Sequence, residues 1–250
     1  MTAIDPQRAG GLRPAPGSVV SLALAIERDD VVRLLGYPEG KRPPERIAAL
    51  LEPTLTEARR LACARGASVS VPIARAHELG LDAQAATGLV VGLVTIGPAL
   101  EARVAELLRA GEATEALLLD ASGSAAAEEA ADQLGALLAD AAVDGPRSTA
   151  SGAVLRSGVA AASSLARASR LSCRISPGYG NWPITAQRAL FDVVPHAEVG
   201  VELLPTMLMA PCKSISFAMW LGADARPIAG LSGCARCELE RCRYRRARET

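Results

Sequence analysis

Aromatic residues are scarce in this chain, with two Trp, three Tyr and two Phe among 250 residues. The chain also lacks an excess of charge of either sign, because 27 Lys and Arg residues balance 27 Asp and Glu residues. Nucleic-acid binding needs a concentrated basic surface, so we expect no nucleic-acid partner. Half of the residues are hydrophobic, which is enough to bury a substantial core in one or two domains.

The N-terminal residues lack the apolar core of a signal peptide. Charged side chains interrupt a stretch rich in Gly and Pro, at Asp5, Arg8 and Arg13. We therefore expect a cytoplasmic protein and treat residues 1–17 as a flexible leader.

One uncharged run, Ala83 to Leu100, reaches the lower length limit of a membrane-spanning helix. Its proline, polar residues and three glycines argue against a span. The run instead predicts a strand over Leu89–Ile96, a turn at Gly97 and a helix that opens at Pro98. No membrane partner is expected.

Further strands are predicted where apolar residues alternate, at Val19–Ile26, Val69–Ile73, Val199–Leu204 and Ser214–Leu221. Helices that are separate from these strands, without a regular βαβ rhythm, indicate an α+β fold. The first helix should be capped by Asp29 or Asp30 and end at Gly36. Later helices are predicted from Pro43 to Leu61, with Pro53 as a kink or break, and over residues 99–110, 116–142 and 150–172.

The segment Arg174-Ile175-Ser176-Pro177-Gly178-Tyr179-Gly180 combines a cation, a rigid turn and an aromatic ring. Proline presets one backbone angle, and glycine permits left-handed geometry or a close approach of a ligand to the backbone. Arginine offers a planar fork of donors that suits a carboxylate. The segment therefore has the features of a ligand cradle, with an ordinary Pro-Gly turn and a solvated arginine as the alternative.

The segments that follow resemble a known family in their order and spacing. Residues 181–188 read Asn-Trp-Pro-Ile-Thr-Ala-Gln-Arg, and residues 207–216 read Met-Leu-Met-Ala-Pro-Cys-Lys-Ser-Ile-Ser. Together with the Arg174 segment, this array resembles the activation (reactivation) domain of cobalamin-dependent methionine synthase. It is closer still to stand-alone proteins related to that domain, which end in a short cysteine cluster. The match is strong over residues 174–222, weaker over residues 67–138 and uninformative before Ser18.

The resemblance implies a twisted antiparallel sheet with helices packed around it. We expect an N-terminal subdomain at residues 18–66 and an activation-domain-like α+β domain at residues 67–226. Residues 227–250 would form a cysteine-containing basic tail, whose arginines fit a solvated terminus better than a docking patch.

The resemblance also implies an S-adenosylmethionine site. Arg174 would hold the carboxylate of the ligand, and the backbone of Ser176, Pro177 and Gly178 would approach the ligand closely. Tyr179 would offer its ring near the sulfonium, because a cation is attracted to the face of an aromatic ring.

An acid on the central helix would complete this site. Glu128 is the best match, and Glu129 and Asp132 are rivals, because Asp132 shares a helical face with Glu128. A solvated helix face is the alternative for each of these acids. Asp120 follows an apolar run, and we expect it to cap a helix in preference to lining the pocket.

The cysteines form a second chemical signal, Cys234-x-x-Cys237-x-x-x-x-Cys242. Close spacing in a cytoplasmic chain predicts metal or redox chemistry and not a disulfide framework. Three thiolates are one short of a closed zinc or iron-sulfur set, so Cys212, Cys173 or a partner chain would supply the fourth. Unliganded thiols on a basic tail are the alternative.

The function implied by the resemblance is the rescue of an oxidised cobalamin by reductive methylation. S-adenosylmethionine would supply the methyl group, and a flavodoxin or ferredoxin would supply the electron. The chain lacks an Asp-x-His-x-x-Gly sequence, so cobalamin should come with a partner, either methionine synthase or another corrinoid protein. The chain would be accessory to methyl transfer. In a second interpretation it is a metal-binding or iron-sulfur redox accessory, or a chaperone, of a corrinoid protein and does not use S-adenosylmethionine.

Overall fold

The computed structural model describes residues 18–37, 40–81, 86–144, 171–172, 174–179 and 181–222. Its main sheet has four antiparallel strands in the order β1-β2-β3-β6, which span Ser18–Ser21, Arg65–Pro72, Gly88–Thr95 and Ser214–Leu221. A separate two-stranded hairpin consists of β4 (Glu202–Leu203) and β5 (Met209–Ala210). The predicted α+β fold with an antiparallel sheet is confirmed.

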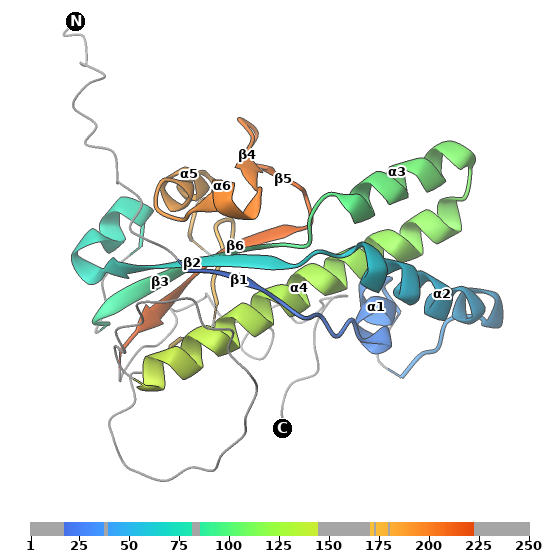
Figure 1. Ribbon diagram of the computed structural model, residues 1–250, viewed down its shortest axis with the longest axis horizontal. Coiled ribbons are helices and arrows are strands. Elements are labelled where there is room, and N and C mark those ends of the chain that lie inside the picture. The colour runs from blue at the N-terminus through green and yellow to red at the C-terminus, as the bar shows by residue number, and fades with distance from the viewer. Residues whose placement is uncertain are drawn as a thin grey trace, which may run out of the picture.

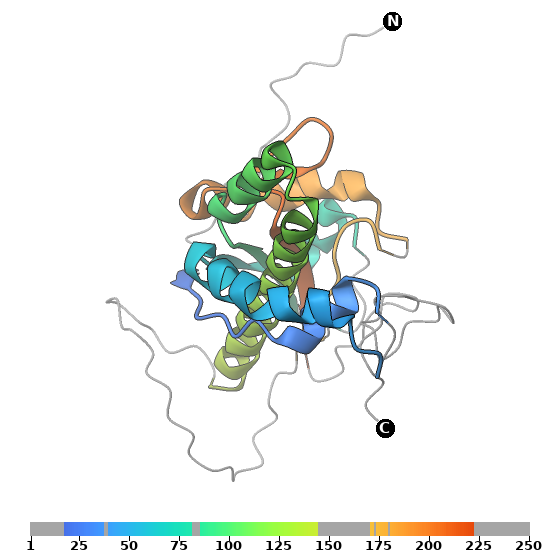
Figure 2. The ribbon, with the colours of Figure 1, turned by 90° about the vertical axis from the view of Figure 1, so that its right-hand side faces the viewer.

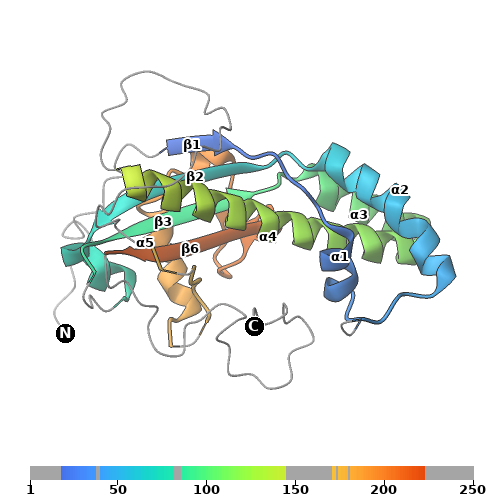
Figure 3. The same cartoon turned by 90° about the horizontal axis from the view of Figure 1, so that it is seen from below.

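Helices cover both faces of the sheet (Figure 1). On one face lies α4 (Ala113–Asp144), with α1 (Arg28–Leu34), α2 (Glu45–Leu61) and α3 (Ala99–Ala110) packed against it. Figure 3 shows α4 lying over the strands, with α2 and α3 beside one end of this helix, and Figure 2 shows α2 and α3 in front when the molecule is viewed from that end. The opposite face carries η2 (Ile73–Leu79), η3 (Ile184–Ala186), α5 (Gln187–Phe191) and α6 (His196–Val199).

Strand β6 belongs to both cores, because alternate side chains of a strand point to opposite faces. Phe217 and Met219 pack in the core beneath α4. Ala218 and Trp220 pack in the core on the α5 side. Small residues on α4 let the helix lie close to the sheet: Ala126, Ala127, Ala130 and Ala131 are all buried.

The predicted boundaries are confirmed where local signals are strong. Helix α3 and strand β6 span the predicted residues, and the uncharged run forms β3 and the start of α3. No helix in the part of the chain that the structure describes is long and apolar enough to cross a membrane. The division at residue 66 stays a prediction, with β1 paired to β2 in the main sheet.

Several boundaries predicted at the N-terminal end are wrong. Strand β1 ends at Ser21, before the predicted Ile26. Glu27 is the N-cap of α1, and Asp29 and Asp30 lie in its first turn, where acidic side chains favour the helix dipole without capping.

Pro53 lies within α2 and neither ends nor splits the helix. The carbonyl that loses a hydrogen-bond partner there belongs to Ala49, which is exposed, so water can satisfy it.

The strand predicted over Val199–Leu204 is also wrong. Val199 ends helix α6, and Gly200 follows it with a φ of 75°. This left-handed glycine is a common helix C-terminus, so the extended chain is limited to Glu202–Leu203.

Gly92 of β3 faces Phe217 of β6, and a Cβ at this position would lie 2.3 Å from Phe217 Cζ. We expect Gly92→Ala to lower the free energy of unfolding by about 1–3 kcal/mol, because the buried ring has to move. Urea unfolding measures this loss. Gly88→Ala on the same strand is the control, since its Cβ would meet no atom closer than 3.5 Å. Equal losses in the two variants would contradict the close packing of Phe217 on Gly92.

Candidate functional site

A β-bulge at the outer edge of β6 determines where Arg174 points. Leu171 pairs with Leu221 and Ile175 pairs with Ala218. The chain thus advances four residues between the two pairs, while β6 advances only three. One residue is therefore extra, and beyond it the side chains change faces. Accordingly, Leu171 packs against the core under α4, whereas Ile175 is buried in the core on the opposite face.

The bulge also corrects part of the sequence prediction. Leu171 and Ser172 are extended, although the predicted helix over residues 150–172 includes them, and residues 150–170 lie outside the described chain. Ser172 Oγ accepts a hydrogen bond from the Trp220 N–H (2.9 Å), so a side chain replaces part of the backbone ladder.

The bulge allows the Arg174 side chain to reach two acids of α4. Its Nη2 donates to Asp132 Oδ1 at 2.6 Å and to Glu128 Oε2 at 3.2 Å. The guanidinium also lies over Phe217, 5.6 Å from the ring centroid. Arg174 is 20% exposed, against 41% for Glu128 and 39% for Asp132, so the arginine is held at the rim of the core and the acids stay open to solvent.

The rival Glu129 does not join this cluster. Its Oε1 accepts a hydrogen bond from Gln133 Nε2 at 2.7 Å, and the same nitrogen lies 2.7 Å from the Ala23 carbonyl. Glu129 therefore belongs to the contact between α4 and the chain after β1. Of the acids considered, the structure places Glu128 and Asp132 beside Arg174.

The segment after Arg174 forms a tight turn. The Tyr179 N–H donates to the Ser176 carbonyl at 3.2 Å, with Pro177 and Gly178 as the central residues. Gly178 has a φ of 94°, which a type II turn requires at its third position. Pro177 has no N–H to continue the pairing with β6. Tyr179 is 68% exposed, so its side chain lies on the surface.

Trp182 attaches this turn to the opposite helical layer. Its Nε1 donates to the Leu79 carbonyl at 2.8 Å, and its ring is buried. The Gly178 N–H donates to the Trp182 carbonyl at 2.8 Å, so the turn is fixed at both ends.

A second cation contacts the same side of α4. Asp120, Ser124, Glu128 and Asp132 follow one another at intervals of four residues, so they form one stripe. Lys213 Nζ lies 2.8 Å from Asp120 Oδ1 and 2.8 Å from Ser124 Oγ. The prediction that Asp120 caps a helix is wrong, because Asp120 lies inside α4 and pairs with a lysine remote in sequence.

The turn that carries Lys213 is held from two further sides. Its backbone N–H donates to Glu101 of α3. Ser214 Oγ donates to the Pro211 carbonyl at 2.7 Å and lies 2.9 Å from Thr95 Oγ1. These contacts place the Pro-Cys-Lys-Ser segment between α3, α4 and β3.

All three residues of the cysteine cluster lie outside the described chain. Cys63 and Cys212 are described, and both are exposed free thiols. No group of three or more His, Cys, Asp or Glu residues among the described positions could hold a metal ion. Cys173, Cys234, Cys237 and Cys242 lie outside the described residues, so the metal site stays a prediction.

The comparisons with known proteins support the fold. No family model and no curated protein matches the chain. Among solved structures, the chain is similar to the crystal structure of the MetH reactivation domain bound to AdoHcy, with a TM-score of 0.54 and 13% sequence identity. The match covers 90% of this chain and 85% of that one. At this identity the likeness shows the fold, and it confirms the reactivation-domain fold that the sequence motifs predicted.

Proposed function

We propose that this chain binds S-adenosylmethionine at Arg174 and Glu128 and supports the reductive methylation of a corrinoid protein. The observation that carries the proposal is the contact between Arg174 and the acids of α4, which brings a cation and a carboxylate from distant segments to one partly open place. An α-amino acid head group, with its carboxylate and ammonium, needs this pair of charges.

The contacts of Arg174 leave room for a ligand. Both contacts use Nη2, and Nε and Nη1 make no hydrogen bond to any residue that the structure describes. These nitrogens can donate to a ligand carboxylate. The Glu128 contact is the longer of the two, so giving up this contact to a ligand ammonium costs less free energy than giving up the Asp132 contact.

The turn over residues 176–179 provides the next part of the site. Gly178 has a φ of 94°, which turns the chain here, and the Tyr179 ring, which is 68% exposed, would lie beside the sulfonium of the ligand. The fold match adds support, because that domain was crystallised with AdoHcy, the product that S-adenosylmethionine leaves after methyl transfer.

The partner in this proposal is a cobalamin-dependent methionine synthase or a related corrinoid methyltransferase. The partner's corrinoid supplies the cobalt that accepts one electron and the methyl group. This chain contributes binding and orientation of the methyl donor, and a flavodoxin or ferredoxin supplies the electron. A cytoplasmic location is part of the same proposal.

Calorimetry with S-adenosylmethionine tests the site. We expect one binding event in the unaltered chain and at least about tenfold weaker binding in Arg174→Ala, because a charge-assisted hydrogen bond is lost. Arg109→Ala is the matched control, since Arg109 is an exposed arginine on α3, and it should bind like the unaltered chain. Absence of binding in the unaltered chain would overturn the proposal and favour the redox accessory that does not use S-adenosylmethionine.

The cysteine cluster is a separate part of the proposal. We propose that Cys234, Cys237 and Cys242 bind zinc or an iron-sulfur cluster, with the exposed Cys212 thiol as the candidate fourth ligand.

Assays for iron, zinc and acid-labile sulfide on anaerobically purified protein test the cysteine cluster. We expect about one metal site per chain, with Cys237→Ser reducing the metal content strongly and Cys63→Ser leaving it unchanged. Metal-free protein in which all six thiols react with a thiol reagent would show that the tail carries free cysteines.

A further inference from the structure

A pocket of about 380 Å³ lies between α5, α6 and β4, on the face of the sheet opposite α4. Its lining consists of Arg188, Phe191, Asp192, His196 and Leu203. None of these residues belongs to the Arg174 site. Three of the five are ionisable, which is unusual for a pocket whose floor is apolar.

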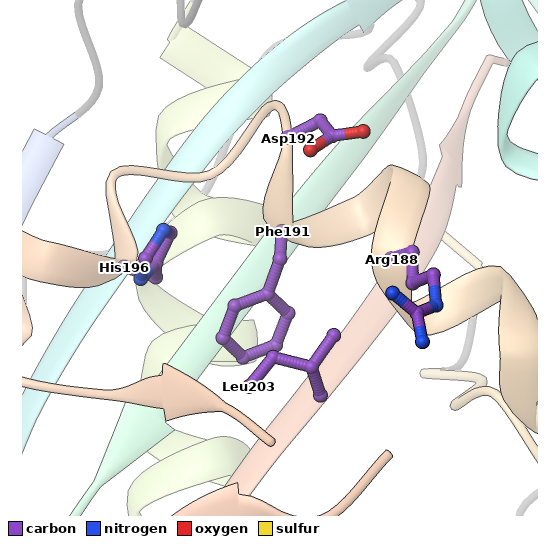
Figure 4. Close-up of a pocket in the computed structure, with 5 residues that line it drawn as sticks. All are labelled: Arg188, Phe191, Asp192, His196 and Leu203. Carbon is purple, nitrogen blue, oxygen red and sulfur yellow. The ribbon is translucent and has the colours of Figure 1, made fainter. Parts of the chain in front are cut away.

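The floor of the pocket is ordered by packing. Phe191 is 6% exposed, and its ring contacts the His196 ring with 5.1 Å between centroids. Figure 4 shows the Phe191 ring between His196 and Arg188, with Leu203 below it and Asp192 above. Phe191 and Leu203 therefore offer an apolar surface that charged groups surround.

His196 has a fixed orientation in this pocket. Its Nδ1 lies 2.7 Å from the Val201 carbonyl, which can only accept, so Nδ1 carries a proton and donates it. No metal-ligand cluster forms around this ring among the described residues.

Arg188 and Asp192 carry opposite charges at the rim. They are four residues apart, on α5 and the turn that ends it, yet neither side chain makes a hydrogen bond or ion pair with any residue that the structure describes. An arginine that precedes its acid by four residues is in the less favourable order for a helical ion pair. Both charges are thus available to a ligand that carries both counter-charges.

We infer that this pocket is a second ligand site, which takes a small zwitterionic α-amino acid with an apolar side chain. Arg188 binds the carboxylate, Asp192 binds the ammonium, and the side chain lies on Phe191 and Leu203. Its volume accommodates an amino acid. A metal ion fits poorly, because Arg188 places a positive charge in the lining.

Nuclear magnetic resonance titration of the ¹⁵N-labelled full chain tests the inference, with L-methionine as the probe. We expect saturable shifts at the amides of residues 187–203. Two analogues isolate the charges, because L-methioninamide lacks the carboxylate and N-acetyl-L-methionine lacks the ammonium. Each analogue should bind at least about tenfold more weakly than L-methionine.

Single variants then assign the contacts. Arg188→Gln should remove the preference for L-methionine over its amide, and Asp192→Asn should remove the preference over the N-acetyl compound. Both side chains are exposed, so neither substitution disturbs the core. Arg109→Gln, a neutralised arginine on α3, is the control and should retain both preferences.

The outcomes separate this site from the S-adenosylmethionine site. Arg174→Ala should leave L-methionine binding at residues 187–203 unchanged, whatever it does to S-adenosylmethionine. Shifts that do not saturate, equal affinity for all three compounds, or saturable shifts confined to residues 174–179 and α4 would each overturn the inference.

Discussion

The candidate site depends on two cationic side chains that hold the C-terminal segments against one stripe of α4. Arg174 joins Glu128 and Asp132, and Lys213 joins Asp120 and Ser124. Each cation comes from a segment of the motif array, one before β6 and one at its start. Because the four stripe residues repeat every helical turn, a single rigid element aligns both motifs. A shift of α4 along its axis would therefore disturb both contacts together.

The bulge at the edge of β6 explains how one short segment contacts the helices on both faces of the sheet. Without the extra residue, Leu171 and Ile175 would point to the same face, because they are four residues apart. With it, Arg174 reaches α4 while Ile175 enters the opposite core. The following Pro177 ends the pairing and directs the chain into the turn that exposes Tyr179. The turn that exposes Tyr179 thus forms where the pairing along the sheet edge stops, whereas the charged groups that meet at Arg174 come from this segment and from α4.

The two candidate ligand sites have similar side chains and lie on opposite faces of the sheet. Each combines an arginine with an acid beside an aromatic ring, which suits a zwitterionic head group. They differ in what surrounds the charges. The Arg174 site lies beside an exposed turn, whereas Phe191 and Leu203 line a pocket of about 380 Å³. In the two proposals, a methyl donor would bind on one face of the sheet and a small amino acid on the other.

The sequence by itself determined the α+β fold, the limits of α3 and β6, and the identity of the motif array, because these depend on local periodicity and on residue order. It narrowed the acid of the site to three residues of one helix. Only the tertiary structure decided that Glu128 and Asp132 face Arg174 while Glu129 faces Gln133, because the rotation of α4 on the sheet is set by packing. The pairing of Asp120 with Lys213 and the bulge before Arg174 have no local signal, since each depends on segments that meet only in the folded chain.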